Sequence, residues 1–141
     1  MGNAVRDALL VAVGGSIGAL TRYGAGLVAA KYLGRGFAWG TLAVNVAGCF
    51  VMGIVLEVML NLESRPAEAL TPALKLQLAL WRQGVAIGFL GALTTFSTFG
   101  ADTLRDLEGG RPLVSLANVM ANLVLSLVAV WVGMMVMRAG D

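Results

Sequence analysis

The sequence has no histidine, a single cysteine and few charged residues. Without histidine, the commonest acid–base side chain is missing, and no convincing nucleophile–base pair is visible. Cys49 stands alone, so neither a disulfide framework nor a thiolate metal site is predicted. Charged residues make up 13% of the chain and hydrophobic residues 58%, which is too apolar for a soluble domain. We therefore expect a membrane protein that is not an enzyme.

Four apolar stretches account for most of the 141 residues. Residues 36–56, 83–101 and 112–137 carry no charge, and residues 8–30 are interrupted by one arginine. As a helix, residues 36–56 would be about 31 Å long, close to the thickness of the hydrocarbon layer. We predict an all-α integral membrane protein, with a single four-helix transmembrane domain covering residues 1–141. The expected spans are residues 4–31, 37–61, 73–103 and 112–138.

The third span has a middle that suits a helix poorly. Residues 91–99 read GALTTFSTF, and four hydroxyl side chains fall within five of these positions: Thr94, Thr95, Ser97 and Thr98. Threonine has low helix propensity, and hydroxyl groups compete for the backbone hydrogen bonds of a helix. Gly88 and Gly91 loosen the backbone just before them. We expect this helix to be broken near mid-membrane, with bare carbonyl and hydroxyl groups facing an ion.

Polar side chains also lie inside the second and fourth spans. Thr41 and Asn45 are four residues apart and therefore share a helix face. Asn45 needs partners in hydrocarbon, so it either bridges two helices or offers its N–H groups to an anion. On the fourth span, Asn118, Asn122 and Ser126 form a stripe with the same spacing. The stripe predicts either a wetted groove or a tightly paired polar seam.

The first span combines small residues with one charge. Its Gly14-xxx-Gly18 pattern, like Gly84-xxx-Gly88 in the third span, is typical of helices that approach one another closely. Arg22 either reaches for the membrane interface or lies at a pore vestibule, where it would attract anions. The same stretch loosely resembles a signal peptide, but its glycines and arginine weaken that interpretation. We expect it to be retained as a span.

The basic residues give almost no preferred orientation in the membrane. With four spans, the two termini and the central loop share one side, and the two other loops share the opposite side. The first side has Arg6, Arg65, Lys75, Arg82 and Arg138, and the second has Lys31, Arg35, Arg105 and Arg111. The positive-inside rule therefore permits both orientations, and with them an antiparallel homodimer. A single, weakly encoded orientation is the alternative.

Three motifs in this order and span layout resemble those of the small bacterial fluoride channels, the Fluc or CrcB proteins. They are GGSIGALTRY at residues 14–23, GTLAVNVAG at 40–48 and GALTTFSTFG at 91–100. The resemblance covers essentially the whole chain. It implies a dual-topology, antiparallel homodimer in the bacterial inner (plasma) membrane, with two pores that each take residues from both subunits.

The resemblance also implies roles for single residues. Phe96 and Phe99 match the pore-facing phenylalanines, whose ring edges carry the positive part of the quadrupole. Asn45 matches an asparagine that donates to fluoride, and Asn122 stands where a smaller hydroxyl residue is expected. The implied fluoride-pore set is Arg22, Thr41, Asn45, Phe96, Ser97, Thr98, Phe99, Asn122 and Ser126.

The ion chemistry that the resemblance implies is passive. Hydrogen fluoride crosses bilayers as a neutral acid and ionises in the cytoplasm, and the channel lets fluoride leave down its electrochemical gradient. The backbone carbonyls of Gly91 and Thr94 match the positions that hold a structural Na⁺ at the dimer centre. Unwound carbonyls can replace water around such a cation without a charged side chain. The partners implied are thus fluoride, Na⁺, lipid and a second copy of the chain, and the outcome is fluoride resistance.

Two alternatives belong to other classes. A small dual-topology, proton-coupled multidrug exporter needs a carboxylate within the membrane, whereas Glu57 and Asp102, the acidic residues closest to such a place, fall at span ends. A purely structural membrane subunit fits the composition but gives no reason for a broken third span.

Overall fold

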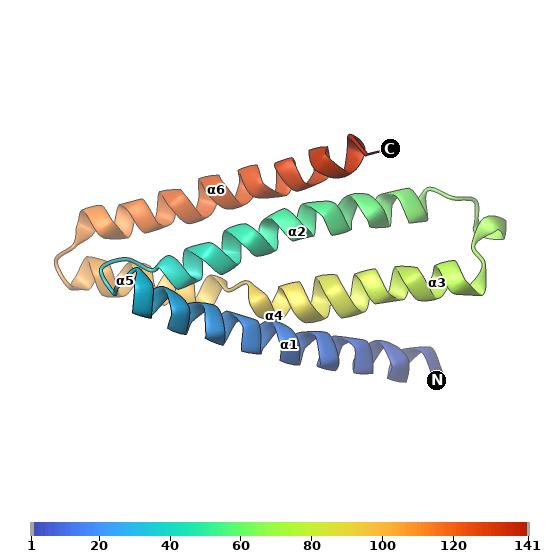
Figure 1. Ribbon diagram of the computed structural model, residues 1–141, viewed down its shortest axis with the longest axis horizontal. Helices are drawn as coiled ribbons and strands as arrows, with labels where there is room; N and C mark the ends of the chain where they lie inside the picture. The colour runs from blue at the N-terminus through green and yellow to red at the C-terminus, as the bar shows by residue number, and fades with distance from the viewer. Residues whose placement is uncertain (1, 141) are drawn as a thin grey trace.

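The computed structural model describes residues 2–140 as a bundle of helices (Figure 1). Asp141, the last acidic residue of the chain, lies outside the described residues. The long elements are α1 (Gly2–Tyr32), α2 (Trp39–Glu63), α3 (Pro72–Ala79) with the π-helical η2 (Leu80–Leu90), α5 (Phe96–Glu108) and α6 (Pro112–Arg138). The short elements are η1 (Ala67–Ala69) and α4 (Gly91–Leu93).

Within residues 2–140, four helical segments are long and apolar enough to cross a membrane: Asn3–Tyr32, Trp39–Glu63, Pro72–Glu108 and Pro112–Arg138. The prediction of an all-helical protein with four such segments is confirmed. Their outer faces carry many exposed hydrophobic side chains, such as Leu20, Leu113 and Leu127. In water such faces would be costly, but in a bilayer they lie against lipid. The chain is therefore a multi-pass membrane protein.

The third segment extends further than expected. The third span was expected to end at residue 103, before most of the charged residues that follow, but α5 continues to Glu108. A glycine pair ends it, since Gly109 is the C-cap and Gly110 has a φ of +72°. Charge did not stop the helix because Asp102 and Arg105 pair three residues apart on its surface, at 3.1 Å.

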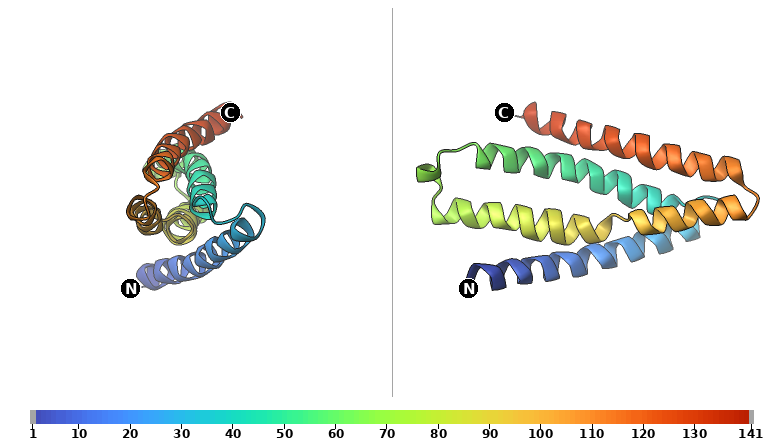
Figure 2. Two further views of the ribbon diagram at one scale, coloured as in Figure 1. Left: turned by 90° about the vertical axis from the view of Figure 1, so that its left-hand side faces the viewer. Right: turned by 180° about the vertical axis from the view of Figure 1, so that it is seen from behind.

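The helices run side by side along the long axis of the molecule (Figures 1 and 2). Both chain ends lie at one end of the bundle with the connection between α2 and α3. The connections after α1 and after α5 lie at the other end. The closest packing joins α2 to α6 and α1 to η2. A small core of Val44, Val55, Leu90 and Leu93 lies where α2 meets η2 and α4.

Glycines set both of these close approaches. A Cβ atom on Gly14 would collide with the carbonyl oxygen of Gly84, and one on Gly18 would collide with that of Phe89. The predicted close packing of the two glycine patterns is thereby confirmed. The α2–α6 pair uses the same device at Gly53 and at Gly133, which the sequence analysis did not single out. Backbones in contact at these points fix the register of the helices along their axes.

Substitution of Gly18 tests this packing. Gly18→Ala should destabilise the folded protein by about 1–3 kcal/mol, because the added methyl group has to push η2 away. Gly24→Ala is the matched control on the same helix, since a Cβ there meets nothing within 4 Å. Thermal unfolding in detergent compares the two variants. Equal stability of both variants would contradict the close approach of α1 and η2.

Candidate functional site

The helical backbone of the third segment stops at Leu93 and starts again at Phe96. Between them Thr94 (φ −79°, ψ 155°) and Thr95 (φ −152°, ψ 118°) are extended. The hydroxyl group of Thr95 accepts a hydrogen bond from the Thr98 N–H at 3.2 Å and caps α5. The Thr94 hydroxyl group donates to the Leu90 carbonyl at 2.9 Å. Local side-chain bonds thus serve both ends of the extended pair.

Asn45 on α2 serves the backbone of the same pair. Its Oδ1 accepts from the Thr95 N–H at 2.8 Å, and its Nδ2 donates to the Thr95 carbonyl at 3.3 Å. Nδ2 also donates to Oδ1 of Asn122 on α6, at 2.9 Å. Asn45 is half-buried and Thr95 is buried, so water has little access to the Thr95 backbone groups. The bonds to Asn45 take the place of hydrogen bonds to water. One side chain therefore joins α2, the extended backbone and α6.

The polar stripe on α6 is a paired seam at its first two positions, and the second of them also borders a pocket. Asn118 is fully buried and Asn122 is 5% exposed. Nδ2 of Asn122 donates to both Oδ1 and the backbone carbonyl of Asn118, at 2.9 and 3.1 Å. Ser126, one turn further, is half-buried and lines a pocket.

The two phenylalanines of α5 lie next to each other beside Asn45. Their ring centroids are 5.4 Å apart and the ring planes are inclined at 57°. Phe99 is 8% exposed, whereas Phe96 is 80% exposed and turned outward from the chain. With Asn45, Asn122 and Ser126 they line a pocket of about 240 Å³, which Cys49, Thr94, Thr95 and Leu123 complete.

A second pocket also borders Thr95. It has about 340 Å³, and Arg22, Thr41 and Thr98 line it together with Thr95. Because Thr95 borders both pockets, the two are neighbouring compartments. None of the described residues that line them is acidic. An anion in the first compartment therefore meets amide, hydroxyl and aromatic groups, and one in the second meets hydroxyl, guanidinium and aromatic groups, with no lining carboxylate in either.

Two residues of the expected set lie apart from these linings. Ser97 is exposed, and its hydroxyl group lies 3.2 Å from that of Thr95. Gly91 is exposed at the start of α4. The remaining members of the expected pore set, together with Thr94, line one or other of the two pockets.

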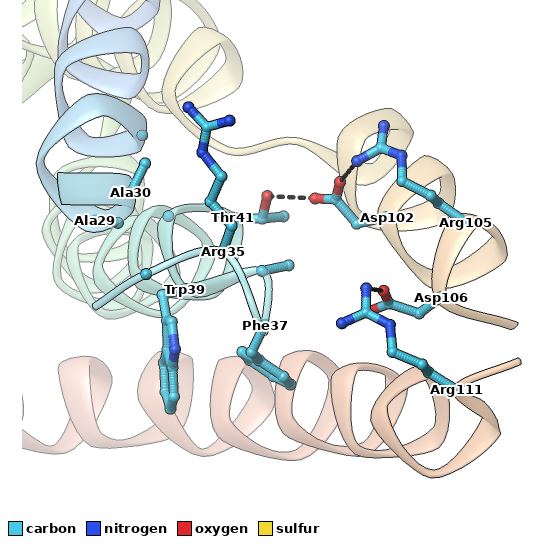
Figure 3. A pocket seen from close by; sticks show the side chains of 14 residues that line it. Ala29, Ala30, Arg35, Phe37, Trp39, Thr41, Asp102, Arg105, Asp106 and Arg111 are labelled. Carbon is cyan, nitrogen blue, oxygen red and sulfur yellow. Dashed lines mark hydrogen bonds and ion pairs between the residues drawn. The ribbon is translucent and has the colours of Figure 1, made fainter. Parts of the chain in front are cut away.

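A third pocket, of about 330 Å³, opens at the end of the bundle near the α5–α6 turn (Figure 3). There the Thr41 hydroxyl group donates to Asp102 at 3.0 Å, and Arg105 pairs with the same carboxylate. Arg111 pairs with the buried Asp106 and also donates to the Gly36 carbonyl at 3.2 Å. Asp102 was not among the expected site residues. Its place four residues after Thr98, on the same face of α5, could have indicated that it lies near the site.

Comparison with known proteins places the chain in a family. Residues 9–134 match the sequence profile described as CrcB-like protein, Camphor Resistance (CrcB). The chain is similar to the fluoride-specific ion channel FluC of Rhizobium leguminosarum, with 42% identity over 94% of this chain and 97% of that protein. It is also similar to FluC of Geobacter metallireducens, with 42% identity over 91% of this chain and 94% of its relative. FluC of Vibrio cholerae is 40% identical over 87% of this chain and 88% of its own length. With its four membrane-length segments and this coverage, the chain belongs to the CrcB family.

Proposed function

We propose that this protein is a fluoride-selective channel that lets fluoride leave the cytoplasm passively across the bacterial inner membrane. The relatives that carry the name fluoride-specific ion channel support the substrate. The observation that carries the proposal for this chain is the meeting of Asn45, Phe96 and Phe99 at one pocket beside an extended backbone. No ATP-binding loop is needed, because the anion moves down its own gradient.

The chemistry of the two pockets suits a small anion. Amide N–H groups and the edges of aromatic rings both present positive partial charge, and neither carries a counterion that would have to be displaced. Arg22 adds a positive charge in the second pocket, where it can attract an anion from water. We propose that fluoride passes Arg22, Thr41 and the hydroxyl groups of α5 before it reaches the ring pair, and that Asn122 and Ser126 line the same route. Selectivity over chloride then follows from a narrow path that strips water.

The extended pair Thr94–Thr95 lies near the centre of the uncharged run 83–101. We propose that it interrupts the third transmembrane segment near mid-membrane. Irregular backbone at that depth needs protein partners or a wet cavity. Asn45 supplies the first and the two pockets supply the second.

The functional unit that we propose is an antiparallel homodimer with two pores. Two observations support it. The Phe96 ring is 80% exposed on the single chain, next to the residues that would line the pore. The basic residues are also almost evenly divided between the two ends of the bundle, so the chain has little bias toward one orientation.

A structural Na⁺ at the centre of that dimer fits the backbone of α4. In an uninterrupted helix the Thr95 N–H would bond the Gly91 carbonyl, but here it donates to Asn45. The Gly91 oxygen loses that donor, and the extended ψ of Thr94 turns its carbonyl off the helical direction. These two oxygens would hold the cation, which supplies positive potential to the neighbouring anion route.

The exporter alternative finds no support in the acidic residues closest to the spans. Glu57 pairs at 3.0 Å with Arg138, the last residue of α6, at the end of the bundle where the C-terminus lies. Asp102 is held by Thr41 and Arg105 at the other end. A proton-coupled exporter needs a carboxylate that is free to trade its proton for a cationic substrate.

Substitution of the ring pair tests the route. Phe96→Ile and Phe99→Ile should each lower fluoride efflux to the level of protein-free liposomes, because an aliphatic side chain offers an anion no positive ring edge. Efflux is measured with a fluoride electrode, and size-exclusion chromatography checks that each variant assembles as the wild type does. Undiminished efflux from both variants would exclude the rings from the route.

Asn45→Asp should block fluoride passage. The substitution removes both donated bonds of Nδ2 and places a negative charge in the pocket, where it repels the anion. The same electrode assay is run from pH 6 to pH 8, in which range an unperturbed carboxylate stays charged. Fluoride flux equal to that of the wild type would remove Asn45 from the proposed route.

The antiparallel dimer predicts that the C-terminus faces both sides of the membrane. Two reporters, one active only in the cytoplasm and one only outside it, are fused in turn after Asp141. Comparable signals from both are expected, because the basic residues are balanced between the two ends. Signal from one fusion alone would mean a single orientation.

A further inference from the structure

A row of hydrogen bonds leads from the anion pocket into the α5–α6 interface. Asn45 donates to Asn122 at 2.9 Å, and Asn122 donates to Oδ1 of Asn118 at 2.9 Å. Asn118 donates to the Thr103 hydroxyl group at 2.8 Å, and that hydroxyl group donates to the Phe99 carbonyl at 2.8 Å. The row thus starts at the side chain that meets Thr95 and ends on the residue that carries the inner ring. We call these five residues the amide row.

The direction of the amide row is fixed at its first end. The Thr95 N–H can only donate, and it points at Oδ1 of Asn45 at 2.8 Å. A flipped Asn45 amide would set its NH₂ group against that N–H, with donor facing donor. Nδ2 must therefore face Asn122, and Asn122 must turn its own oxygen toward Asn45.

Backbone carbonyls fix the direction at the other positions. Nδ2 of Asn122 faces the carbonyl oxygen of Asn118 at 3.1 Å, and the Thr103 hydroxyl group faces that of Phe99. A carbonyl oxygen can only accept, so reversal of Asn122 or of the Thr103 hydroxyl group would set two acceptors against each other. Reversal of Asn118 would set its NH₂ group against that of Asn122, with donor facing donor. Every amide in the row consequently has one permitted orientation, and each bond polarises the next.

The two N–H groups of Asn45 are not held equally. The bond to Asn122 is 2.9 Å long, whereas the bond to the Thr95 carbonyl is 3.3 Å long and weaker. The second N–H is the one that an anion in the pocket could take over at lower cost. The first keeps the amide plane in place while that exchange occurs.

We infer that Asn118 and Asn122 are positioning residues, which fix the Asn45 amide so that one N–H stays committed to Asn122 and the other is available to the anion. The inference rests on the proposed fluoride conduction and adds to it the device that sets its selectivity. Asn118 gives the clearest test, because it is fully buried and is absent from the lining of the pocket that holds the rings. An effect of Asn118 on anion discrimination would have to travel through Asn122.

The competing explanation is that the row only joins helices. Ser115 separates the two explanations, because it is buried on the same helix and its hydroxyl group donates to the Thr103 carbonyl at 2.9 Å. It joins α6 to α5 as Asn118 does, but it meets Thr103 only at the backbone carbonyl and takes no part in the bonds that run from Asn45 through the Thr103 hydroxyl group. Ser115→Ala is therefore a matched control for loss of an α5–α6 hydrogen bond.

The test compares Asn118→Leu and Ser115→Ala with the wild type in liposomes. The measured quantity is the ratio of the initial fluoride efflux rate to the initial chloride efflux rate, each after subtraction of the rate from protein-free liposomes. A fraction of unfolded channels lowers both rates and leaves this ratio unchanged, so the ratio reports the path itself. We expect Asn118→Leu to lower the ratio about fivefold or more, as suits loss of one well-oriented buried bond, and Ser115→Ala to leave it at the wild-type value. Equal ratios in the two variants would overturn the inference.

If Asn118→Leu does not assemble, a second pair of variants tests the inference instead. Thr103→Val keeps the shape of the side chain and removes its hydroxyl group, whereas Thr103→Ser keeps the hydroxyl group and removes a methyl group. The ratio should fall in the valine variant and recover in the serine variant, because the row needs the hydroxyl group. A ratio that follows the methyl group instead would overturn the inference. A wild-type channel that moves no fluoride would contradict the proposed function itself, and the inference with it.

Discussion

The hydrogen bond from the Thr95 N–H to Oδ1 of Asn45 is the interaction on which the rest of the site depends. A helix that stops inside an apolar bundle leaves backbone groups that must find partners. The side-chain amide of Asn45 forms hydrogen bonds with both the N–H and the carbonyl of Thr95. The same bond takes from Gly91 the donor that a continuous helix would give it, and it sets the direction of every later bond in the amide row. The break in the third segment and the pocket beside it thus depend on one hydrogen bond.

That constraint works because the helices cannot slide past each other. Gly14 and Gly18 hold α1 against η2, and Gly53 and Gly133 hold α2 against α6 with backbones in contact. A shift of one residue along α2 would carry Asn45 about 1.5 Å away from Thr95 and break bonds that are close to their ideal length. Rigid packing of small residues is therefore what gives the polar groups their accuracy.

Much of this architecture could be predicted from the sequence, but not the partners of single side chains. Hydropathy located four membrane-length helices, because uncharged runs of that length leave few alternatives. The hydroxyl-rich residues 94–98 marked the poor helix former for a local reason, namely competition for backbone bonds. The bond between Thr41 and Asp102 and the part of Thr103 in the amide row could not be predicted, since they depend on the axial register of helices far apart in the chain. The end of α5 was misplaced because charge was given more weight than the glycine pair that stops it.

The amide row has a further consequence that follows from what its members are. Asparagine side chains, a threonine hydroxyl group and a backbone carbonyl neither gain nor lose protons in the range that bacteria experience. Fluoride enters cells fastest in acidic surroundings, because there more of it is present as neutral hydrogen fluoride. The amide row, which we propose to position the anion site, has no group that titrates in this range and keeps its shape through such an acid shock. A row built from histidine or carboxylate side chains would be rearranged. The fluoride efflux that we propose would then continue under the conditions in which most fluoride enters the cell.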